Sequence, residues 1–387
     1  MATGGGTGKA ACLTSPPNNR FTYPIGDFFF FPSPGVFTSS HRDATSLRLE
    51  SLTPRVSERM LHERPLQSLC ARSRGTLVAI PRPPDFDWTA AVLGELARDD
   101  HALGAVAVVA LPHCHWCDGS TLDLVRIGEA CRALRVPLVC DITQSAGVMP
   151  FDVNEVCPAF VACSVHKWLH GAYGCSLAYA APGFLDLSGA RRVVGGGGTD
   201  ARHVATLENF ERQLAGSDSP RWDEAGEAFS AEGYAGQNWQ DARVLDGGGR
   251  PNPVTIPVLL DALRTVVREW TPERTAAYSA ALTGRIAAAA RDVGFLVPNT
   301  HAPHIVGIRV PTASVGRGLA PARAPSAAAV ERATALARGM RADGVVVSVR
   351  SGAVRVSVGT YTTEREVERL VASLQKHARH LCPRPRM

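Results

Sequence analysis

Two apolar runs, each followed by polar residues, decide the fold: "VPLVCDITQSAG" at Val136–Gly147 and "AFVACSVHKW" at Ala159–Trp168. Each run begins with a short stretch that suits a buried strand. The first strand is predicted to end at Asp141, and Lys167 follows the second one closely. Ligands of open α/β sheets bind outside the carboxyl ends of the strands, so this edge is predicted to bring a carboxylate and an amine together.

Three further apolar runs are typical of buried strands: "TLVAI" at 76–80, "AVAVVAL" at 105–111 and "CSLAYA" at 175–180. Residues 122–135, "LDLVRIGEACRALR", predict a helix with Asp123 in its first turn. Its apolar face is predicted to comprise Leu124, Ile127, Gly128, Cys131 and Leu134. The order strand, helix, strand predicts a βαβ unit with a right-handed connection.

Composition indicates a globular chain with a large core. The 387 residues are 45% hydrophobic, which is enough for two folding units. The 41 basic and 36 acidic residues leave a net charge of +5 without any basic block, so nucleic-acid binding is not indicated. No apolar run reaches the roughly 18 residues that a membrane span needs, and we expect a soluble protein.

Cysteine usage points to a reducing compartment, and the cytoplasm is the expected location. Seven of the ten cysteines lie between Cys114 and Cys175, without the spacing of a disulfide-stapled scaffold. The first 26 residues carry Lys9 and Arg20 and no acid, so an organellar transit segment stays an open alternative.

The stretch "HCHWCD" is the one candidate for a metal site. It places Cys114 and Cys117 beside His113 and His115, but no second ligand pair follows at zinc-site spacing. We therefore expect no metal.

Asp141 and Lys167 admit two interpretations. They can form a partly buried ion pair in an unrelated doubly wound α/β protein. The wider set favours a cofactor site, because Gln144, Ser164 and His166 add an amide, a hydroxyl and an imidazole near the same strand ends. Pyridoxal phosphate needs such groups: an amine for its aldehyde, a carboxylate for its ring nitrogen and several donors for its phosphate.

Residues 75–387 resemble the class V aminotransferase-like enzymes of pyridoxal phosphate fold type I, whose members include cysteine desulfurases and kynureninases. The densest matches are "HWCDGSTLDL", "VCDITQSAGVMPFDV", "SVHKWLHGAYGCSLAYAAP" and "DGGGRPNPVTIPVLLDAL". The resemblance implies that Lys167 forms a Schiff base with pyridoxal 5'-phosphate and that Asp141 partners the ring nitrogen. It also implies that Gln144 contacts the phenolic oxygen and that Ser164 and His166 bind the phosphate.

The resemblance also implies a homodimer with shared active sites. The segment "GGGRPNP" at 247–253 resembles the one that crosses between subunits, and Asn252 is the implied donor to the partner's phosphate. An arginine near the end of the chain is expected to bind the substrate α-carboxylate, with Arg355 as first choice and Arg350 as second. Trp116 is expected to line the substrate pocket.

The implied fold is α/β: a mainly parallel sheet flanked by helices, with a smaller α+β C-terminal domain. We expect an irregular segment over residues 1–70, a large cofactor-binding domain over 71–265 and a small domain over 266–387. The irregular segment departs from the family pattern, because neither the serine- or threonine-containing phosphate turn nor a ring-stacking aromatic residue is found in it. The front of the large domain is therefore expected to be missing or replaced, which would weaken cofactor retention.

The implied function is that of a pyridoxal phosphate-dependent enzyme acting on an amino acid, by transamination or by kynureninase- or lyase-like cleavage. The alternative is a catalytically weakened relative that serves as a binding or dimerising protein. Desulfurases of the family place a catalytic cysteine in a longer segment near Arg355. Here only "SGAV" separates Arg350 from Arg355, which argues against persulfide chemistry.

Overall fold

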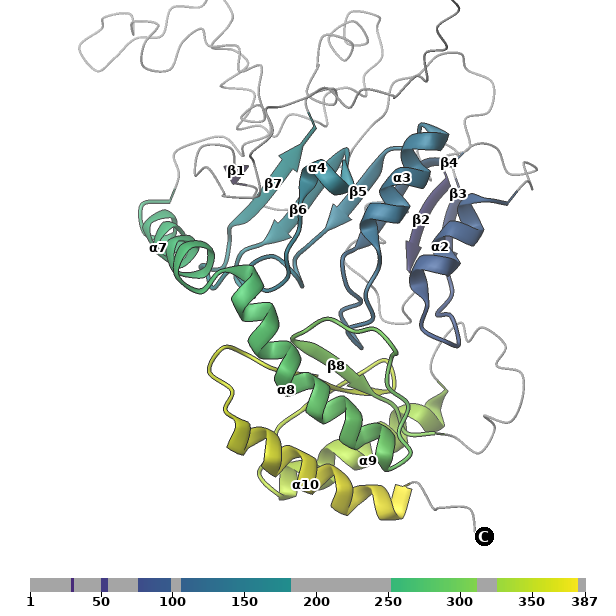
Figure 1. Ribbon diagram of the computed structural model, residues 1–387, viewed down its shortest axis with the longest axis vertical. Helices are drawn as coiled ribbons and strands as arrows, with labels where there is room; N and C mark the ends of the chain where they lie inside the picture. The colour runs from purple at the N-terminus through teal and green to yellow at the C-terminus, as the bar shows by residue number, and fades with distance from the viewer. Residues whose placement is uncertain are drawn as a thin grey trace, which may run out of the picture.

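Two sheets organise the chain (Figure 1). The computed structural model describes residues 29–30, 50–54, 76–98, 106–181, 252–311 and 326–381. These residues form a seven-stranded sheet and a three-stranded sheet, each with helices packed against it.

The seven-stranded sheet has the order β1-β7-β6-β5-β4-β2-β3. Neighbours from β3 to β6 pair in parallel, whereas β7 is antiparallel to β6 and β1 is antiparallel to β7. All five predicted strands are confirmed within one or two residues. The bounds are β1 Phe29–Phe30, β2 Glu50–Pro54, β3 Thr76–Ile80, β4 Val106–Pro112, β5 Leu138–Asp141, β6 Phe160–Ser164 and β7 Ser176–Ala180.

The N-terminal segment differs from the expectation at two places. Strands β1 and β2 both lie within residues 1–70, and β2 inserts between β3 and β4 in the sheet. Parallel pairing with both neighbours satisfies the backbone of β2, although its sequence "ESLTP" has no apolar alternation. Residues 1–70 thus contribute two strands, β1 and β2, to the large sheet. Residues 31–49 and 55–75 lie outside the described parts, and so does any phosphate turn in them.

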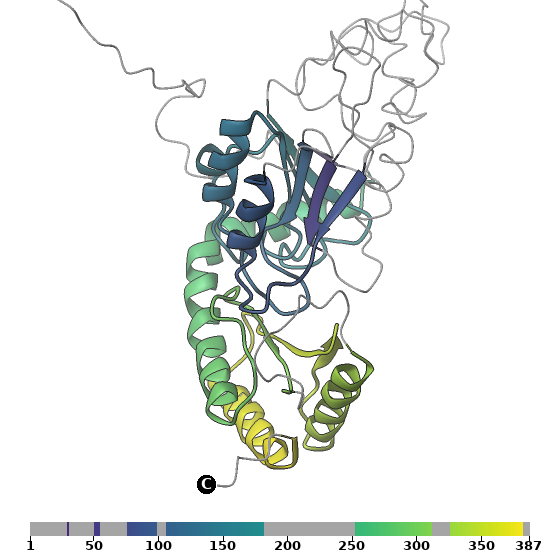
Figure 2. The same ribbon diagram turned by 90° about the vertical axis from the view of Figure 1, so that its right-hand side faces the viewer.

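Three helices cover one face of the large sheet: α2 Trp88–Leu96, α3 Leu124–Leu134 and α4 Val153–Val156 (Figures 1 and 2). An aspartate side chain caps the start of each one, because it accepts a hydrogen bond from a backbone N–H of the first turn.

The predicted helix is confirmed as α3, with one correction on its apolar face. Four of its predicted core residues are buried, but Leu134 is 52% exposed. The helix ends at Leu134, where Arg135 takes a left-handed conformation, so no further turn covers this side chain.

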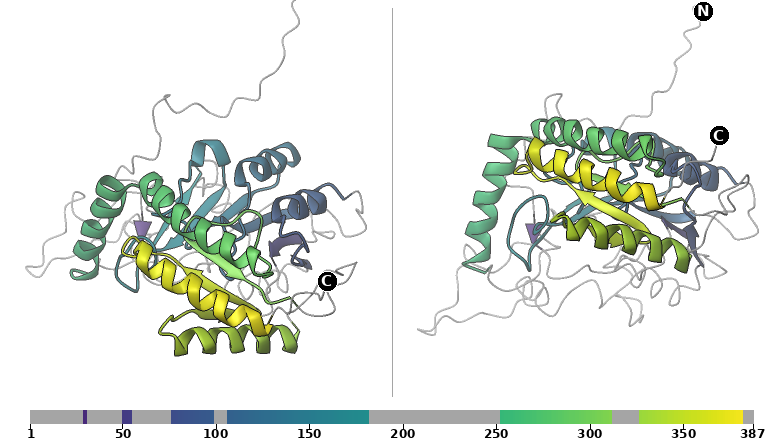
Figure 3. Two further views of the ribbon diagram at one scale, coloured as in Figure 1. Left: turned by 60° about the horizontal axis from the view of Figure 1, so that its bottom comes forward. Right: turned by 90° about the horizontal axis from the view of Figure 1, so that it is seen from below.

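The three-stranded sheet has the order β8-β10-β9 and is antiparallel throughout. Its strands are β8 Ile305–Ile308, β9 Ser348–Arg350 and β10 Ala353–Ser357. Three helices pack with it: α8 Pro272–Asp292, α9 Ala327–Ala342 and α10 Glu364–Leu381 (Figure 3). Helix α7 Thr255–Leu263 and the π-helical segment η5 Arg264–Trp270 lead from the large sheet into α8.

Each sheet has its own hydrophobic core. One core contains buried residues from Ile80 to Val266, and the other contains residues from Leu282 to Ala378. The predicted domain boundary at residue 265 lies in η5, one residue before Val266, the last residue of the first core. No helix in the described ranges is long and apolar enough to cross a lipid bilayer.

A loop of the large unit enters the small one after β4. Gly119 on this loop has φ +77°, and its carbonyl accepts a hydrogen bond from the Ala302 N–H at 2.6 Å. A Cβ added at Gly119 would overlap the carbonyl oxygen of Ile305. Only glycine therefore allows this close approach of the two units.

We expect Gly119→Ala to lower the free energy of unfolding by about 2–5 kcal/mol, since left-handed strain of about 1–2 kcal/mol is joined by a backbone clash. Gly174→Ala is the matched control, because Gly174 has φ +88° but nothing within 4 Å of the place that an added methyl group would take. It should lose only the strain energy, about 1–2 kcal/mol. Urea unfolding measures both, and equal losses would contradict a tight approach at Gly119.

Candidate active site

The carboxyl ends of β4, β5 and β6 form one edge of the large sheet, and this edge faces the small unit (Figure 1). Parallel pairing aligns Pro112 with Asp141 and Asp141 with Ala162. Asp141 therefore lies in the middle of the edge. Lys167 follows the end of β6 by three residues, in the turn that leads away from Ser164.

Local hydrogen bonds hold the Asp141 carboxylate in place. Its Oδ1 accepts from the Thr143 N–H at 2.8 Å, and Thr143 Oγ1 accepts from the Ser164 N–H at 3.0 Å. The threonine thus links the end of β5 to the end of β6. This link fixes the two predicted cofactor-binding segments relative to each other.

The charges of two side chains, Asp141 and Arg355, act on Lys167. Partial desolvation lowers the pKa of the Lys167 amine, and the Arg355 guanidinium acts in the same direction. The Asp141 carboxylate opposes both effects. The structure therefore brings together the predicted pair and also Arg355, which comes from β10 of the small unit.

Gln144 is oriented by two aromatic residues that the sequence reasoning missed. The Trp168 indole Nε1–H donates to Gln144 Oε1 at 3.1 Å, so the Gln144 amide nitrogen is left to donate elsewhere. His304 Nε2 donates to the Gln144 main-chain carbonyl oxygen at 2.6 Å. The His304 ring packs edge-on against Trp168, with ring centroids 4.2 Å apart. His304 precedes β8, so this contact also joins the two units.

His113 is a second residue whose position the sequence reasoning missed. It follows β4 directly, as Asp141 ends β5, and its Nδ1 lies 3.0 Å from Ser145 Oγ. Burial lowers the pKa of His113 to about 4, which keeps its ring neutral at physiological pH. Its place immediately after a strand end was the available signal.

The predicted phosphate-binding residues lie on separate elements. Ser164 is the last residue of β6, and the His166 ring stacks on Tyr173 with centroids 4.2 Å apart. Desolvation and then the Lys167 charge lower the pKa of His166. Asn252 is exposed, and its Oδ1 accepts from the N–H groups of Val254 and Thr255 at the start of α7.

The predicted substrate-binding residues gather at the junction of the units. Arg355 Nε donates to Ser357 Oγ at 3.0 Å, and burial is the main reason that the pKa of Arg355 is lowered. The Arg350 guanidinium carbon lies 5.8 Å from the centroid of the Trp116 ring. The charge of Arg350 also lowers the pKa of Arg355, to a smaller extent than burial.

The cysteines of this region are inert thiols. Cys114 Sγ lies 3.7 Å from the Gln144 carbonyl oxygen, and Cys117 Sγ lies 3.5 Å from Ser351 Oγ. Burial raises the pKa of both thiols to about 12. Within the ranges that the structure describes, no three His, Cys, Asp or Glu side chains are arranged to hold a metal ion.

The sequence matches a protein-family model. The family model "Aminotransferase class-V" matches residues 67–226, which include β3 to β7, Asp141 and Lys167. Among curated proteins, none matches the chain in sequence.

Solved structures of similar shape include two cysteine desulfurases and a cystine C–S lyase. The desulfurase of Thermococcus onnurineus NA1 is 17% identical with a TM-score of 0.56, over 86% of this chain and 74% of that chain. The desulfurase CsdA of Escherichia coli is 18% identical with a TM-score of 0.58, over 86% and 73%. The lyase C-DES, solved with its product cysteine persulfide, is 18% identical with a TM-score of 0.59, over 86% and 76%. The predicted fold, that of fold type I pyridoxal phosphate-dependent enzymes, is confirmed, and so is the class V aminotransferase-like resemblance.

Buried histidines make the stability of the site depend on pH. Desolvation is the main reason that the pKa of His304 is lowered to about 3, whereas an unfolded histidine titrates near 6.5. Between these values the unfolded chain binds a proton that the folded chain does not. The contribution of the neutral His304 to the free energy of unfolding is therefore fully present above about pH 6.5. It is lost as the pH falls toward 3.

We expect His304→Gln to reduce the change of the unfolding free energy with pH by up to about 1.4 kcal/mol per pH unit. Glutamine can donate a hydrogen bond to the Gln144 main-chain carbonyl but does not titrate. Urea unfolding of the parent and the variant between pH 7 and pH 4 measures the two slopes. Equal slopes would show that His304 is not held neutral in the folded protein.

Proposed function

We propose that this class V aminotransferase-like chain is a pyridoxal phosphate-dependent enzyme that acts on an amino acid, by transamination or by lyase- or kynureninase-like cleavage. One observation carries the proposal: the Asp141 carboxylate and the Arg355 guanidinium both act on the Lys167 amine at the carboxyl edge of the sheet. They supply a covalent anchor, a partner for a ring nitrogen and a carboxylate-binding group.

The donor set fits pyridoxal phosphate at its reactive end. Condensation with an aldehyde needs a neutral amine, and the lowered pKa of Lys167 favours that form. The Asp141 carboxylate is held rigidly by Thr143, as a partner for a protonated ring nitrogen must be. The Gln144 amide nitrogen is free of the bond that Trp168 makes to the amide oxygen, so it can donate to a phenolic oxygen.

Ser164, His166 and Asn252 are the proposed donors to the phosphate. Asn252 is exposed just before α7, two residues ahead of Val254, which is 70% exposed. This exposure supports the proposal that Asn252 serves the site of a partner subunit in a homodimer.

When bound, pyridoxal phosphate supplies an aldehyde that condenses with amines and a ring that accepts electrons from the substrate α-carbon. Asp141 keeps the proton on the ring nitrogen, because an opposite charge nearby favours the protonated form. Arg355 binds the substrate α-carboxylate through its two parallel N–H groups. The Lys167 amine would be the base that accepts the proton of the substrate α-carbon.

The thiols of the site support cleavage or transamination over desulfuration through a protein persulfide. A persulfide-forming cysteine must attack as a thiolate. Cys114 and Cys117 have pKa values raised to about 12, so both are protonated at neutral pH. The seven described cysteines are free thiols, which supports a reducing compartment such as the cytoplasm.

Lys167→Ala is expected to abolish covalent attachment of pyridoxal phosphate. The chain has three lysines, and Lys376 on α10 is engaged with Asp343 in the small unit, which makes Lys376→Ala the matched control. After incubation with the cofactor and borohydride, intact mass should show one reduced adduct in the parent and the control and none in Lys167→Ala. An adduct at parental yield in Lys167→Ala would remove Lys167 from this role.

Asp141→Asn is expected to retain the cofactor but to slow removal of the α-proton by at least about a hundredfold, since the ring nitrogen loses its charged partner. Proton exchange of L-alanine in D₂O, followed by NMR, measures this step without knowledge of the substrate. Thr143→Val, which removes only the hydroxyl bonded to the Ser164 N–H, should have a much smaller effect. Equal exchange rates in Asp141→Asn and the parent would exclude Asp141 from the mechanism.

A further inference from the structure

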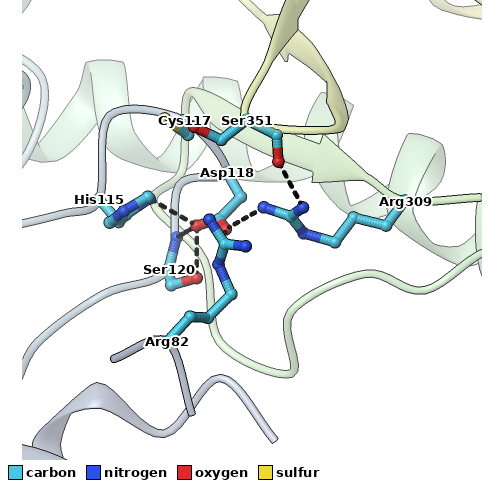
Figure 4. A network of polar contacts seen from close by, with 7 residues as sticks. All are labelled: Arg82, His115, Cys117, Asp118, Ser120, Arg309 and Ser351. Carbon is cyan, nitrogen blue, oxygen red and sulfur yellow. Dashed lines mark hydrogen bonds and ion pairs between the residues drawn. The ribbon is translucent and has the colours of Figure 1, made fainter. Parts of the chain in front are cut away.

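The Asp118 carboxylate lies at the centre of a buried polar cluster between the two units (Figure 4). Its side chain has no exposed surface. Oδ1 accepts from Ser120 Oγ at 2.6 Å, and Oδ2 accepts from Arg309 Nη2 at 3.1 Å. Arg82 Nε lies 3.5 Å from Oδ2, and His115 Nδ1 lies 3.1 Å from Oδ1.

The cluster joins segments that are far apart in sequence. Arg82 follows β3 of the large sheet, Asp118 lies in the loop after β4, and Arg309 follows β8 of the small sheet. The backbone continues the same connection, because the Gly307 N–H donates to the Asp118 carbonyl at 2.9 Å. Asp118 is thus bonded to the small unit through both its side chain and its main chain.

Arg309 extends the cluster to the turn between β9 and β10. Its Nη2 donates to Asp118, and its Nη1 donates to the Ser351 carbonyl at 2.8 Å. Cys117, next to Asp118, places its Sγ 3.5 Å from Ser351 Oγ. The turn has left-handed residues at Ser351 (φ +45°) and Gly352 (φ +71°), so a large-unit loop fixes a tight turn of the small unit.

The Asp118 carboxylate balances the positive charges of Arg82 and Arg309 in the cluster. Burial alone would raise the pKa of its carboxyl, but His115, Arg309 and Arg82 together hold that pKa well below its usual range. Burial and then repulsion by the Arg309 charge lower the pKa of Arg82. Without the carboxylate, two partly buried guanidinium groups would face each other at the junction.

We propose that Asp118 is a positioning residue for substrate binding. Through Arg309 it holds the Ser351 turn, and this turn fixes β10, whose Arg355 acts on Lys167 across the junction. The role in substrate binding rests on the proposed function. The clasp, by which we mean the hydrogen bonds from Arg309 to Asp118 and to Ser351 at the junction of the units, does not rest on it. A cluster that only stabilised the fold would affect cofactor and substrate binding alike.

Asp118→Asn keeps the shape of the side chain and removes its charge. Asp343→Asn is the matched control, because Asp343 also bonds to three side chains, Lys376, Ser373 and His377, but lies within the small unit. Each protein is titrated with pyridoxal phosphate and then with glycine, both followed by the absorbance of the bound cofactor. Glycine carries the amine and carboxylate that all amino acids share.

The half-saturating concentration of pyridoxal phosphate should stay within about threefold of the parent in Asp118→Asn, because Lys167 and Asp141 belong to the large unit. The half-saturating concentration of glycine should rise at least about tenfold, as expected for a lost charge-assisted contact at Arg355. Asp343→Asn should change neither value. Arg309→Lys, which keeps one charge but cannot bridge Asp118 and Ser351, should give an intermediate rise.

Unchanged glycine affinity in both Asp118→Asn and Arg309→Lys would overturn the proposal, and so would an equal rise in Asp343→Asn. A parent chain that binds no pyridoxal phosphate would instead refute the proposed function. In that case hydrogen exchange of the cofactor-free proteins tests the clasp. Amides of 350–357 should exchange faster in Asp118→Asn or Arg309→Lys than in Asp343→Asn, and equal rates would refute the clasp.

Discussion

The register of the parallel strands β4, β5 and β6 is the constraint on which the rest of the site depends. It aligns Pro112, Asp141 and Ala162 across the sheet, so that every residue just beyond these positions emerges at one edge. His113, Gln144 and the turn with Lys167 are all such residues. The position of Asp141 depends on this pairing. If the register of β5 shifted by one residue, the Asp141 side chain would point to the opposite face of the sheet.

The junction between the units contains a polar cluster around Asp118 beside an apolar one that includes Cys114 and Ile305. Burying a carboxylate with two guanidinium groups costs solvation energy, and good geometry is needed to offset it. In return, hydrogen bonds have directions that apolar contacts lack. The bonds from Arg309 to Asp118 and to Ser351 specify one orientation of the small sheet. Such an orientation matters because Lys167 belongs to the large unit and Arg355 to the small one.

The sequence predicted those parts of the fold that are encoded locally. Strands β3 to β7 and helix α3 have apolar runs or helical periodicity of their own, and the pair Asp141 and Lys167 follows from where the strands end. Strands β1 and β2 are short and lack such a pattern, because pairing with distant strands rather than local propensity places them in the sheet. Their prediction failed for that reason.

The supporting residues of the site were missed because their roles exist only in three dimensions. His304 bonds to Gln144 across 160 positions of sequence, and Arg309 bonds to Asp118 across 191. His113 was noted only as a neighbour of two cysteines. Arg355 and Arg350 were predicted from the family resemblance, and the structure adds that Arg355 acts electrostatically on Lys167.

That electrostatic action couples the position of the small unit to the chemistry of the lysine. Desolvation is the main reason that the pKa of the Lys167 amine is lowered, and the Arg355 charge adds an effect in the same direction that depends on how the two units are held together. A carboxylate that binds Arg355 would cancel part of this positive field and favour protonation of Lys167. Without a bound carboxylate, the amine is thus biased toward its neutral form, which is the form that would condense with an aldehyde. If Arg355 binds a substrate carboxylate as proposed, the same amine would become a better acceptor for the proton of the α-carbon.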